Sequence, residues 1–177
     1  LQNAIDATKM KIAAELYKDK TYWINKEITD FKSIKPYDIQ SQLFENNDIT
    51  IKVNYAHKNG YNDNKSEHLD ENTIVFEIID KGIGMDKDGL EALFHIGTGW
   101  RRRENISELM EVIPGWLVPT GGFGIGILST FLLSDKVVFE TKSLQSPQYQ
   151  MTVYSPSKGG AVEKVINRNY YSKSYNA

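Results

Sequence analysis

The chain contains no cysteine among its 177 residues. That absence excludes disulfide bonds, thiolate metal sites and cysteine nucleophiles. No apolar run reaches the roughly eighteen residues that a transmembrane helix needs, so we expect no membrane contact. An excess of one charge is also lacking, because 21 Lys and Arg residues stand against 23 Asp and Glu residues. The resulting net charge of −2 gives no general attraction to nucleic acid, which is therefore not an expected partner.

No signal peptide is visible, and the chain begins at Leu1 rather than at Met. We therefore expect a cytoplasmic protein, with residues missing upstream of Leu1. The length predicts that residues 1–177 form a single domain. A chain of this size buries roughly 70% of its unfolded surface, which is enough for a substantial core.

The densest glycine cluster lies in T-G-G-F-G-I-G-I-L-S at residues 120–129. The apolar run at 125–133 follows at once, which predicts a helix whose first turn is the glycine loop itself. A helix N-terminus has unpaired N–H groups and a partial positive charge, so this junction suits a phosphate. A tight turn before a core helix explains the same residues equally well.

Two familiar glycine loops do not fit this cluster. The P-loop ends in Gly-Lys-Ser/Thr, whereas Gly126 is followed by Ile127 and Leu128. The dinucleotide fingerprint needs G-x-G-x-x-G between a strand and a helix. The spacing here is G-x-G-x-G, and residues 114–119 lack a strand pattern. The loop therefore belongs to another class.

Residues 1–18 contain no Pro or Gly and predict a helix. One apolar stripe consists of Leu1, Ile5, Ile12 and Leu16. The opposite side mixes polar and apolar residues, namely Asn3, Asp6, Ala7, Met10 and Ala14. From the helix alone we expect this side to face solvent, although a helix covered on both sides would have the same semi-apolar pattern.

The remaining chain predicts helical pieces, strands and turns. Residues 19–47 are expected to form helical pieces and loop. The alternation at 49–55 predicts a half-buried strand, and the apolar run at 73–79 predicts a central strand paired with it as a hairpin. A short helix is expected at 88–96. Three further strands, at 136–142, 149–154 and 161–166, predict a C-terminal antiparallel meander.

The predicted central strand ends in D-K-G-I-G-M at residues 80–85. An ionised Asp80 only accepts hydrogen bonds, so it could hold an exocyclic amine. Gly82 and Gly84 would leave room for a flat ring, and Met85 would be a polarisable apolar wall. A turn that ends a strand with a solvated Asp is equally compatible with these residues.

Residues 100–119 lie between two glycine pairs, at 97/99 and at 121/122. Glycines at both ends would let the segment swing as a lid. Thr98, or one of the arginines at 101–103, could reach a phosphate from it. A solvated arginine loop is the ordinary alternative.

Taken in order, these motifs resemble the ATP-binding module shared by DNA gyrase, heat-shock protein ninety chaperones, histidine kinases and mismatch-repair ATPases, the GHKL or Bergerat-fold superfamily. The sequence G-G-F-G-I-G-I-L-S-T-F-L-L-S-D-K-V-V-F-E-T-K-S at 121–143 looks most like the chaperones. The resemblance extends from residue 1 to about residue 166. It implies an α+β fold, a two-layer α/β sandwich in which a mixed, mainly antiparallel sheet carries helices on one face.

The resemblance also implies a site for ATP and Mg²⁺. Asn3 would ligate Mg²⁺, a hard cation that prefers oxygen ligands. Asp80 would accept a hydrogen bond from the adenine amino group. The other implied ATP contacts come from Asp6, Ala7, Gly82, Gly84, Met85, Thr98, Gly121, Gly122, Phe123, Gly124, Ile125 and Gly126.

Three features depart from the family pattern. The family's general base is a Glu four residues before the Asn, which falls ahead of Leu1, so the catalytic residue is unknown. Asp6 and Asp80 lie 74 positions apart (80 minus 6), which exceeds the chaperones' spacing and indicates a subfamily insertion at about 19–72. Finally, a Thr that the chaperones keep near the last strand aligns with Glu163.

We therefore expect the ATP-binding domain of a heat-shock-protein-ninety-like ATPase, in which nucleotide closes the lid at about 97–120 and drives a chaperone-like conformational change. Expected partners are downstream domains of the same chain, a client protein or a second copy. A nucleotide sensor without turnover is an alternative. A histidine-kinase-type phosphotransfer module is another, although none of His57, His68 and His95 lies in a helical phosphoacceptor context.

Overall fold

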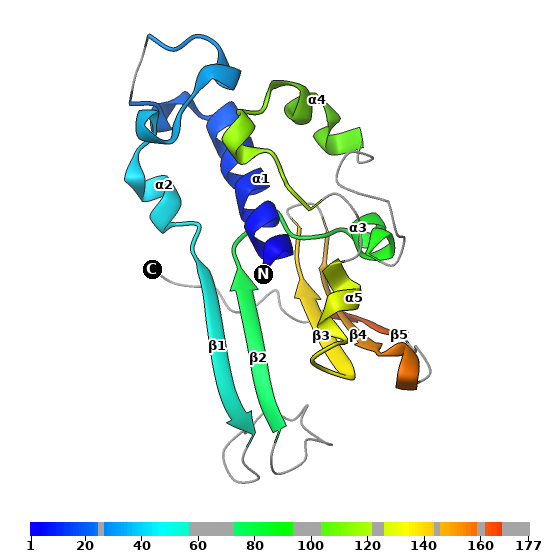
Figure 1. Cartoon of the computed structure of the whole chain (residues 1–177). Helices are drawn as coiled ribbons and strands as arrows, with labels where there is room; N and C mark the ends of the chain where they lie inside the picture. The colour runs from blue at the N-terminus through cyan, green and yellow to red at the C-terminus, as the bar shows by residue number, and fades with distance from the viewer. Residues whose placement is uncertain are drawn as a thin grey trace.

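The computed structural model of the chain describes residues 1–24, 27–56, 73–93, 104–121, 126–143, 146–158 and 162–167. These residues form one long helix, several short helices and two small antiparallel sheets (Figure 1). The predicted α+β class is confirmed. None of the helices in the described ranges has the length and apolar character needed to span a bilayer.

Helix α1 (Gln2–Lys18) is the element around which the other segments are arranged (Figure 1). It forms because its sequence contains no Gly or Pro and is rich in Ala and Lys, which are good helix formers. Lys18 in the last turn interacts favourably with the negative end of the helix dipole. The helix ends where Asp19 adopts an extended conformation, with φ −130° and ψ 102°.

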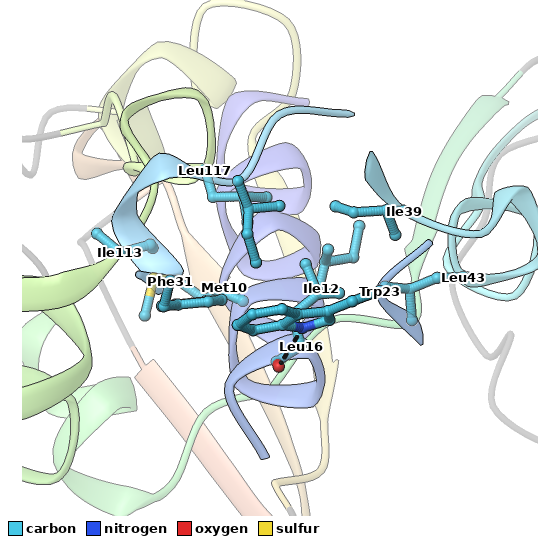
Figure 2. Packing of buried hydrophobic residues seen from close by; sticks show 11 residues of the cluster. Met10, Ile12, Leu16, Trp23, Phe31, Ile39, Leu43, Ile113 and Leu117 are labelled. Carbon is cyan, nitrogen blue, oxygen red and sulfur yellow. Dashed lines mark hydrogen bonds between the residues drawn. The ribbon is translucent and has the colours of Figure 1, made fainter. Parts of the chain in front are cut away.

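The larger core cluster packs around α1 and draws on two distant parts of the chain. Figure 2 shows residues of this cluster around the helix, where the Trp23 indole Nε1 donates a 3.1 Å hydrogen bond to the Leu16 carbonyl. One part is η1 (Lys20–Tyr22), η2 (Phe31–Ser33), η3 (Pro36–Asp38) and α2 (Ser41–Glu45), as predicted for 19–47. The other is α4 (Glu104–Val112), η5 (Gly115–Leu117) and the short connection between them, which together contribute Leu109, Met110, Ile113 and Leu117.

The prediction that the mixed side of α1 faces solvent was wrong in part, whereas Ile12 and Leu16 of the predicted apolar stripe are buried as expected. Leu1 is 58% exposed, whereas Asp6 and Met10, on the side expected to face solvent, are 0% and 1% exposed. The helix is covered on two sides, because segments from 19–47 and 104–121 both pack against it. The semi-apolar pattern of that side therefore reflects burial.

Strands β1 (Ile49–Ala56) and β2 (Thr73–Asp80) form the predicted antiparallel hairpin. The prediction that 73–79 is a central strand was wrong, because β2 pairs only with β1 in the described part of the chain. One face of the hairpin carries three directly opposed apolar pairs, Ile51–Ile78, Val53–Phe76 and Tyr55–Ile74, all of them exposed. The apolar run of β2 thus packs mainly against its neighbour across the ladder.

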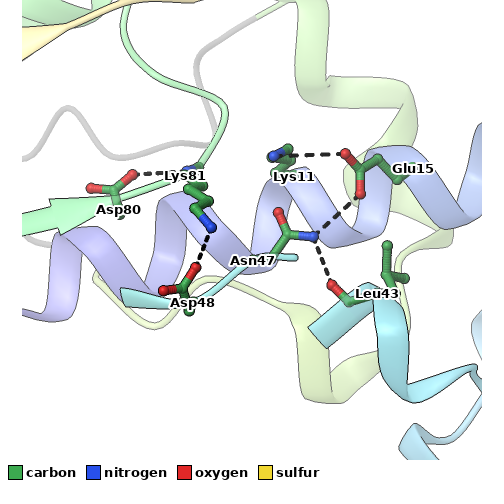
Figure 3. Close-up of polar contacts among 8 residues, drawn as sticks. Lys11, Glu15, Leu43, Asn47, Asp48, Asp80 and Lys81 are labelled. Atoms are coloured by element: carbon green, nitrogen blue, oxygen red, sulfur yellow. Dashed lines mark hydrogen bonds and ion pairs between the residues drawn. The ribbon is translucent and has the colours of Figure 1, made fainter. Parts of the chain in front are cut away.

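Polar contacts attach the base of the hairpin to α1. Figure 3 shows the Asn47 side chain between α1 and α2, where its Nδ2 donates to Glu15 at 3.4 Å and to the Leu43 carbonyl at 2.7 Å. Asn47 is buried and comes just before β1. These bonds fix where the hairpin leaves the helical part of the fold.

The predicted C-terminal meander is confirmed as β3 (Lys136–Thr141), β4 (Gln148–Tyr154) and β5 (Val162–Asn167), in the order β3-β4-β5. A second core cluster joins this sheet to α3 (Lys87–Ala92) through Leu90, Tyr149, Met151 and Val153. Helix α3 begins where Asp86 accepts a 2.8 Å hydrogen bond from the Gly89 N–H, a helix cap. The described strands therefore form two separate sheets, and the single sheet of a two-layer sandwich is not seen among them.

Candidate functional site

The D-K-G-I-G-M turn packs directly on α1 at Ala7. The Ala7 carbonyl accepts a 3.2 Å hydrogen bond from the Ile83 N–H. A Cβ at Gly82 would lie 2.6 Å from the Ala7 Cβ, too close for any side chain. Glycine at position 82 is thus what lets the turn approach the helix.

The start of the glycine segment packs on the same helix one residue earlier, at Asp6. The carboxylate accepts hydrogen bonds from two successive backbone N–H groups, Thr120 to Oδ1 at 3.1 Å and Gly121 to Oδ2 at 2.7 Å. Gln2 Nε2 donates to Oδ1 at 3.0 Å. We predicted Asp6 from the sequence as a pocket residue, but Gln2 and Thr120 carried no pattern that pointed to the site.

Asn3 lies near both described ends of the glycine segment. A Cβ on Gly126, the first residue of α5 (Gly126–Thr130), would lie 3.4 Å from Asn3 Oδ1, and one on Gly121 would lie 4.0 Å from the same atom. The Asn3 side chain is exposed. Asn3, Asp6 and Ala7 are spaced i, i+3 and i+4, so one face of α1 serves both glycine motifs.

Asp80 ends β2 with an exposed carboxylate. Its Oδ1 accepts a 2.9 Å hydrogen bond from the Gly82 N–H, which closes the turn that docks on Ala7. Among the described residues, no other hydrogen bond or ion pair reaches this carboxylate. One carboxylate oxygen is therefore available as an acceptor.

Gly84 and Met85 bring the same turn against the end of β3. The Met85 N–H donates a 2.8 Å hydrogen bond to Thr141 Oγ1. Gly84 has a φ of +67° and lies against the Lys142 backbone. Sequence reasoning did not identify Thr141, because a single Thr near the end of a predicted strand carries no distinguishing signal.

Several predicted site residues lie outside the described residues, namely Thr98, Gly122, Phe123, Gly124 and Ile125. The described part of the predicted lid, 104–120, includes Ile113 and Leu117, both of which are buried in the core around α1. The structure thus brings Asn3, Asp6 and Ala7 together with Gly82, Gly121 and Gly126. The boundaries of the lid stay a prediction.

An ion pair beside Asp80 gives the hairpin a measurable pH dependence. Lys81 pairs with Asp48 (Figure 3), and this hydrogen bond and charge lower the pKa of Asp48 from its ordinary 3.8. A lowered folded-state pKa means that the pair stabilises the fold above pH 3.8, and that this contribution is lost as the pH falls through the folded-state pKa.

We expect an NMR titration to give an Asp48 pKa below 3.8 in the wild type and a value returned toward 3.8 in Lys81→Ala. The stability change at neutral pH should be small, because both side chains are largely exposed. Equal pKa values in the two proteins would contradict the pairing.

Comparison with known proteins supports the resemblance inferred from the motifs. No family model matches the chain. The chaperone protein HtpG of Chlorobium phaeovibrioides is 31% identical over 103 residues, which cover 55% of this chain and 16% of that protein. HtpG of Psychromonas ingrahamii is 29% identical over 117 residues, which cover 63% of this chain and 16% of that protein.

The matched part of the chain thus covers about a sixth of the length of these relatives. The similarity is distant, yet both relatives are chaperones, the class that the sequence at 121–143 resembles most. At the level of sequence, the chain is distantly similar to the HtpG chaperones over 55–63% of its length.

Proposed function

We propose that this chain binds ATP with Mg²⁺ between the N-terminal half of α1, the D-K-G-I-G-M turn and the glycine segment 121–126. The observation that carries the proposal is that one helix face contacts both glycine motifs, Gly82 through Ala7 and Gly121 through Asp6. The distant similarity to HtpG supports the choice of nucleotide.

In this proposal the two motifs bind opposite ends of the nucleotide. Asp80 accepts from the adenine amino group with the oxygen that Gly82 does not use, since an ionised carboxylate has acceptors only. Gly82, Gly84 and Met85 border the ring, with Ala7 behind Gly82. Phosphate contacts come from the glycine segment, and Thr98 is proposed to flank them.

The donor set near the glycine segment fits Mg²⁺ that arrives with a nucleotide. Asn3 offers one exposed amide oxygen close to Gly126. Mg²⁺ commonly binds through one or two protein oxygens, substrate phosphates and water. Within the described ranges, no cluster of three or more His, Cys, Asp or Glu side chains could hold a metal alone. Mg²⁺ would neutralise phosphate charge beside Asn3.

The finer architecture is part of the same proposal. The ends of β2 and β3 meet where Met85 bonds to Thr141 and Gly84 lies against Lys142. We propose that the two sheets lie side by side in one layer, with helices on one face as in a Bergerat sandwich.

At the level of the whole protein, we propose a chaperone-like ATPase in a cytoplasmic setting. The relatives named HtpG are chaperones, and the chain matches a minor part of them. Hydrolysis, lid closure and partners, whether a client, downstream domains or a second copy, belong to that larger proposal. A sensor that binds ATP without turnover is the alternative outcome.

Calorimetric titration with ATP tests the proposal. We expect one binding site with a Kd tighter than about 1 mM, and weaker binding of GTP, whose ring presents a carbonyl where adenine has its amine. Chelation of Mg²⁺ should weaken binding because Asn3 then faces uncompensated phosphates. No detectable heat at millimolar ATP, or equal affinity for GTP, would contradict it. A phosphate-release assay with saturating ATP separates an ATPase from a sensor.

A further inference from the structure

The Asp6 carboxylate occupies the first two amides of the predicted phosphate loop. The N–H groups of Thr120 and Gly121 both point at it, at 3.1 and 2.7 Å. Successive backbone N–H groups that converge in this way bind anions. We propose that the Asp6 carboxylate occupies these amides in place of a bound anion. Asp6 is then a positioning residue, which fixes the start of the loop and is not itself a nucleotide ligand.

The environment of Asp6 leaves little room for a ligand. The residue is 0% exposed, and each carboxylate oxygen already accepts from a backbone N–H. A buried charge is costly unless hydrogen bonds compensate it. In the described part of the chain no cationic side chain pairs with Asp6, so backbone amides and neutral side chains stabilise the charge. If the carboxylate bound a ligand instead, it would lose these hydrogen bonds, and its buried charge would no longer be compensated by them.

Gln2 and Thr120 close the polar cluster from the solvent side. Gln2 Nε2 donates to Thr120 Oγ1 at 2.6 Å as well as to Asp6, and the Thr120 hydroxyl donates to Asp6 Oδ1 at 3.4 Å. The three side chains thus form a closed ring of hydrogen bonds. The first turn of α1 and the start of the glycine segment are therefore held as one unit.

A consequence follows for the phosphate contacts, and this consequence rests on the proposed function. Because the Gly121 N–H is committed to Asp6, we expect that this amide does not bind phosphate. The family resemblance included Gly121 among the ATP contacts. Its N–H instead holds the start of the loop against α1 by donating to Asp6.

Amide hydrogen exchange measured by NMR in the absence of nucleotide tests the positioning role. In Asp6→Asn the amide group replaces one acceptor by a donor, so one backbone N–H loses its partner. We expect exchange of the Thr120 or Gly121 amide to accelerate at least about tenfold. The matched control is Asp38→Asn, which alters another buried carboxylate that accepts a backbone N–H, from Lys35 at 2.9 Å. It should leave exchange at 120 and 121 unchanged.

A milder variant guards against loss of folding in Asp6→Asn. Thr120→Val removes the hydroxyl and keeps both backbone N–H groups, so exchange at Gly121 should rise less than in Asp6→Asn. Unchanged exchange at 120 and 121 in both variants would overturn the proposal. So would loss of Gly121 protection when saturating ATP is added to the wild type, since Asp6 would then have released the amide. Absence of ATP binding would overturn the proposed function. It would not affect the test of the positioning role of Asp6, because exchange is measured without nucleotide.

Discussion

Replacing Gly84 by Ala is expected to reduce the free energy of unfolding by about 2–5 kcal/mol, combining left-handed backbone strain with overpacking. Gly84 has a φ of +67°, which costs energy for a residue with a Cβ. The added carbon would also lie 2.0 Å from the Lys142 carbonyl oxygen. Because the obstacle is backbone, the turn would have to move away from the end of β3.

Gly115→Ala is the matched control for this substitution. Gly115 has no atom within 4 Å of an added Cβ and no left-handed φ, so its replacement should change stability by no more than about 0.5 kcal/mol. Denaturant unfolding of both variants measures the difference. Equal stability of Gly84→Ala and Gly115→Ala would show that the turn at 80–85 does not pack on β3 as described.

Replacing Asp80 by Asn is expected to weaken ATP binding by at least about 100-fold, or about 2.7 kcal/mol, while the fold stays intact. Asp80 Oδ1 accepts from the Gly82 N–H, and the proposed adenine contact uses the other oxygen. An Asn side chain has one acceptor and one donor group. Either the Gly82 N–H or the adenine amine would then face a donor, and a donor left unpaired once the nucleotide covers the site is costly.

Asp48→Asn provides the control for the loss of charge near Asp80. Asp48 pairs with the neighbouring Lys81 and is also exposed, but it offers no contact to a ring beside Gly82. Calorimetry should give near wild-type ATP affinity for Asp48→Asn and no measurable affinity for Asp80→Asn. Similar affinities in the two variants would remove Asp80 from the adenine contact.

Sequence periodicity predicted the elements of this fold well. The absence of Gly and Pro predicted α1, alternation predicted β1, and the turn spacing predicted the meander β3-β4-β5. These signals are local, since each depends on residues a few positions apart. The pairing of β1 with β2 across a long connection also followed, because two neighbouring apolar strands commonly form a hairpin.

Burial on α1 could not be predicted in the same way. Asp6 is buried because Thr120 and Gly121, more than a hundred positions away, bring two amides to it. A polar residue on a helix face that mixes polar and apolar side chains gives no sequence signal of such a distant partner. Conversely, the apolar run of β2 suggested a central strand, but the number of its neighbours depends on how separate sheets meet.

The part of the candidate site that could be predicted is the part that contains motifs resembling a known family. The D-K-G-I-G-M and G-G-F-G-I-G motifs led to Gly82, Gly121 and Gly126, which the structure brings to one helix face. Thr141 was missed because a single Thr at a strand end resembles many others. Its role emerges only from the contact with the Met85 N–H.

The central claim is that Asn3, Asp80 and the glycine segment surround a single nucleotide. NMR of isotope-labelled protein titrated with ATP and Mg²⁺ tests it most directly, through the side-chain amide of Asn3, the carboxyl carbon of Asp80 and the amide of Gly126. The account predicts that all three signals shift along one saturation curve with the same Kd. Shifts at only one of the three positions, or curves with different Kd values, would contradict it.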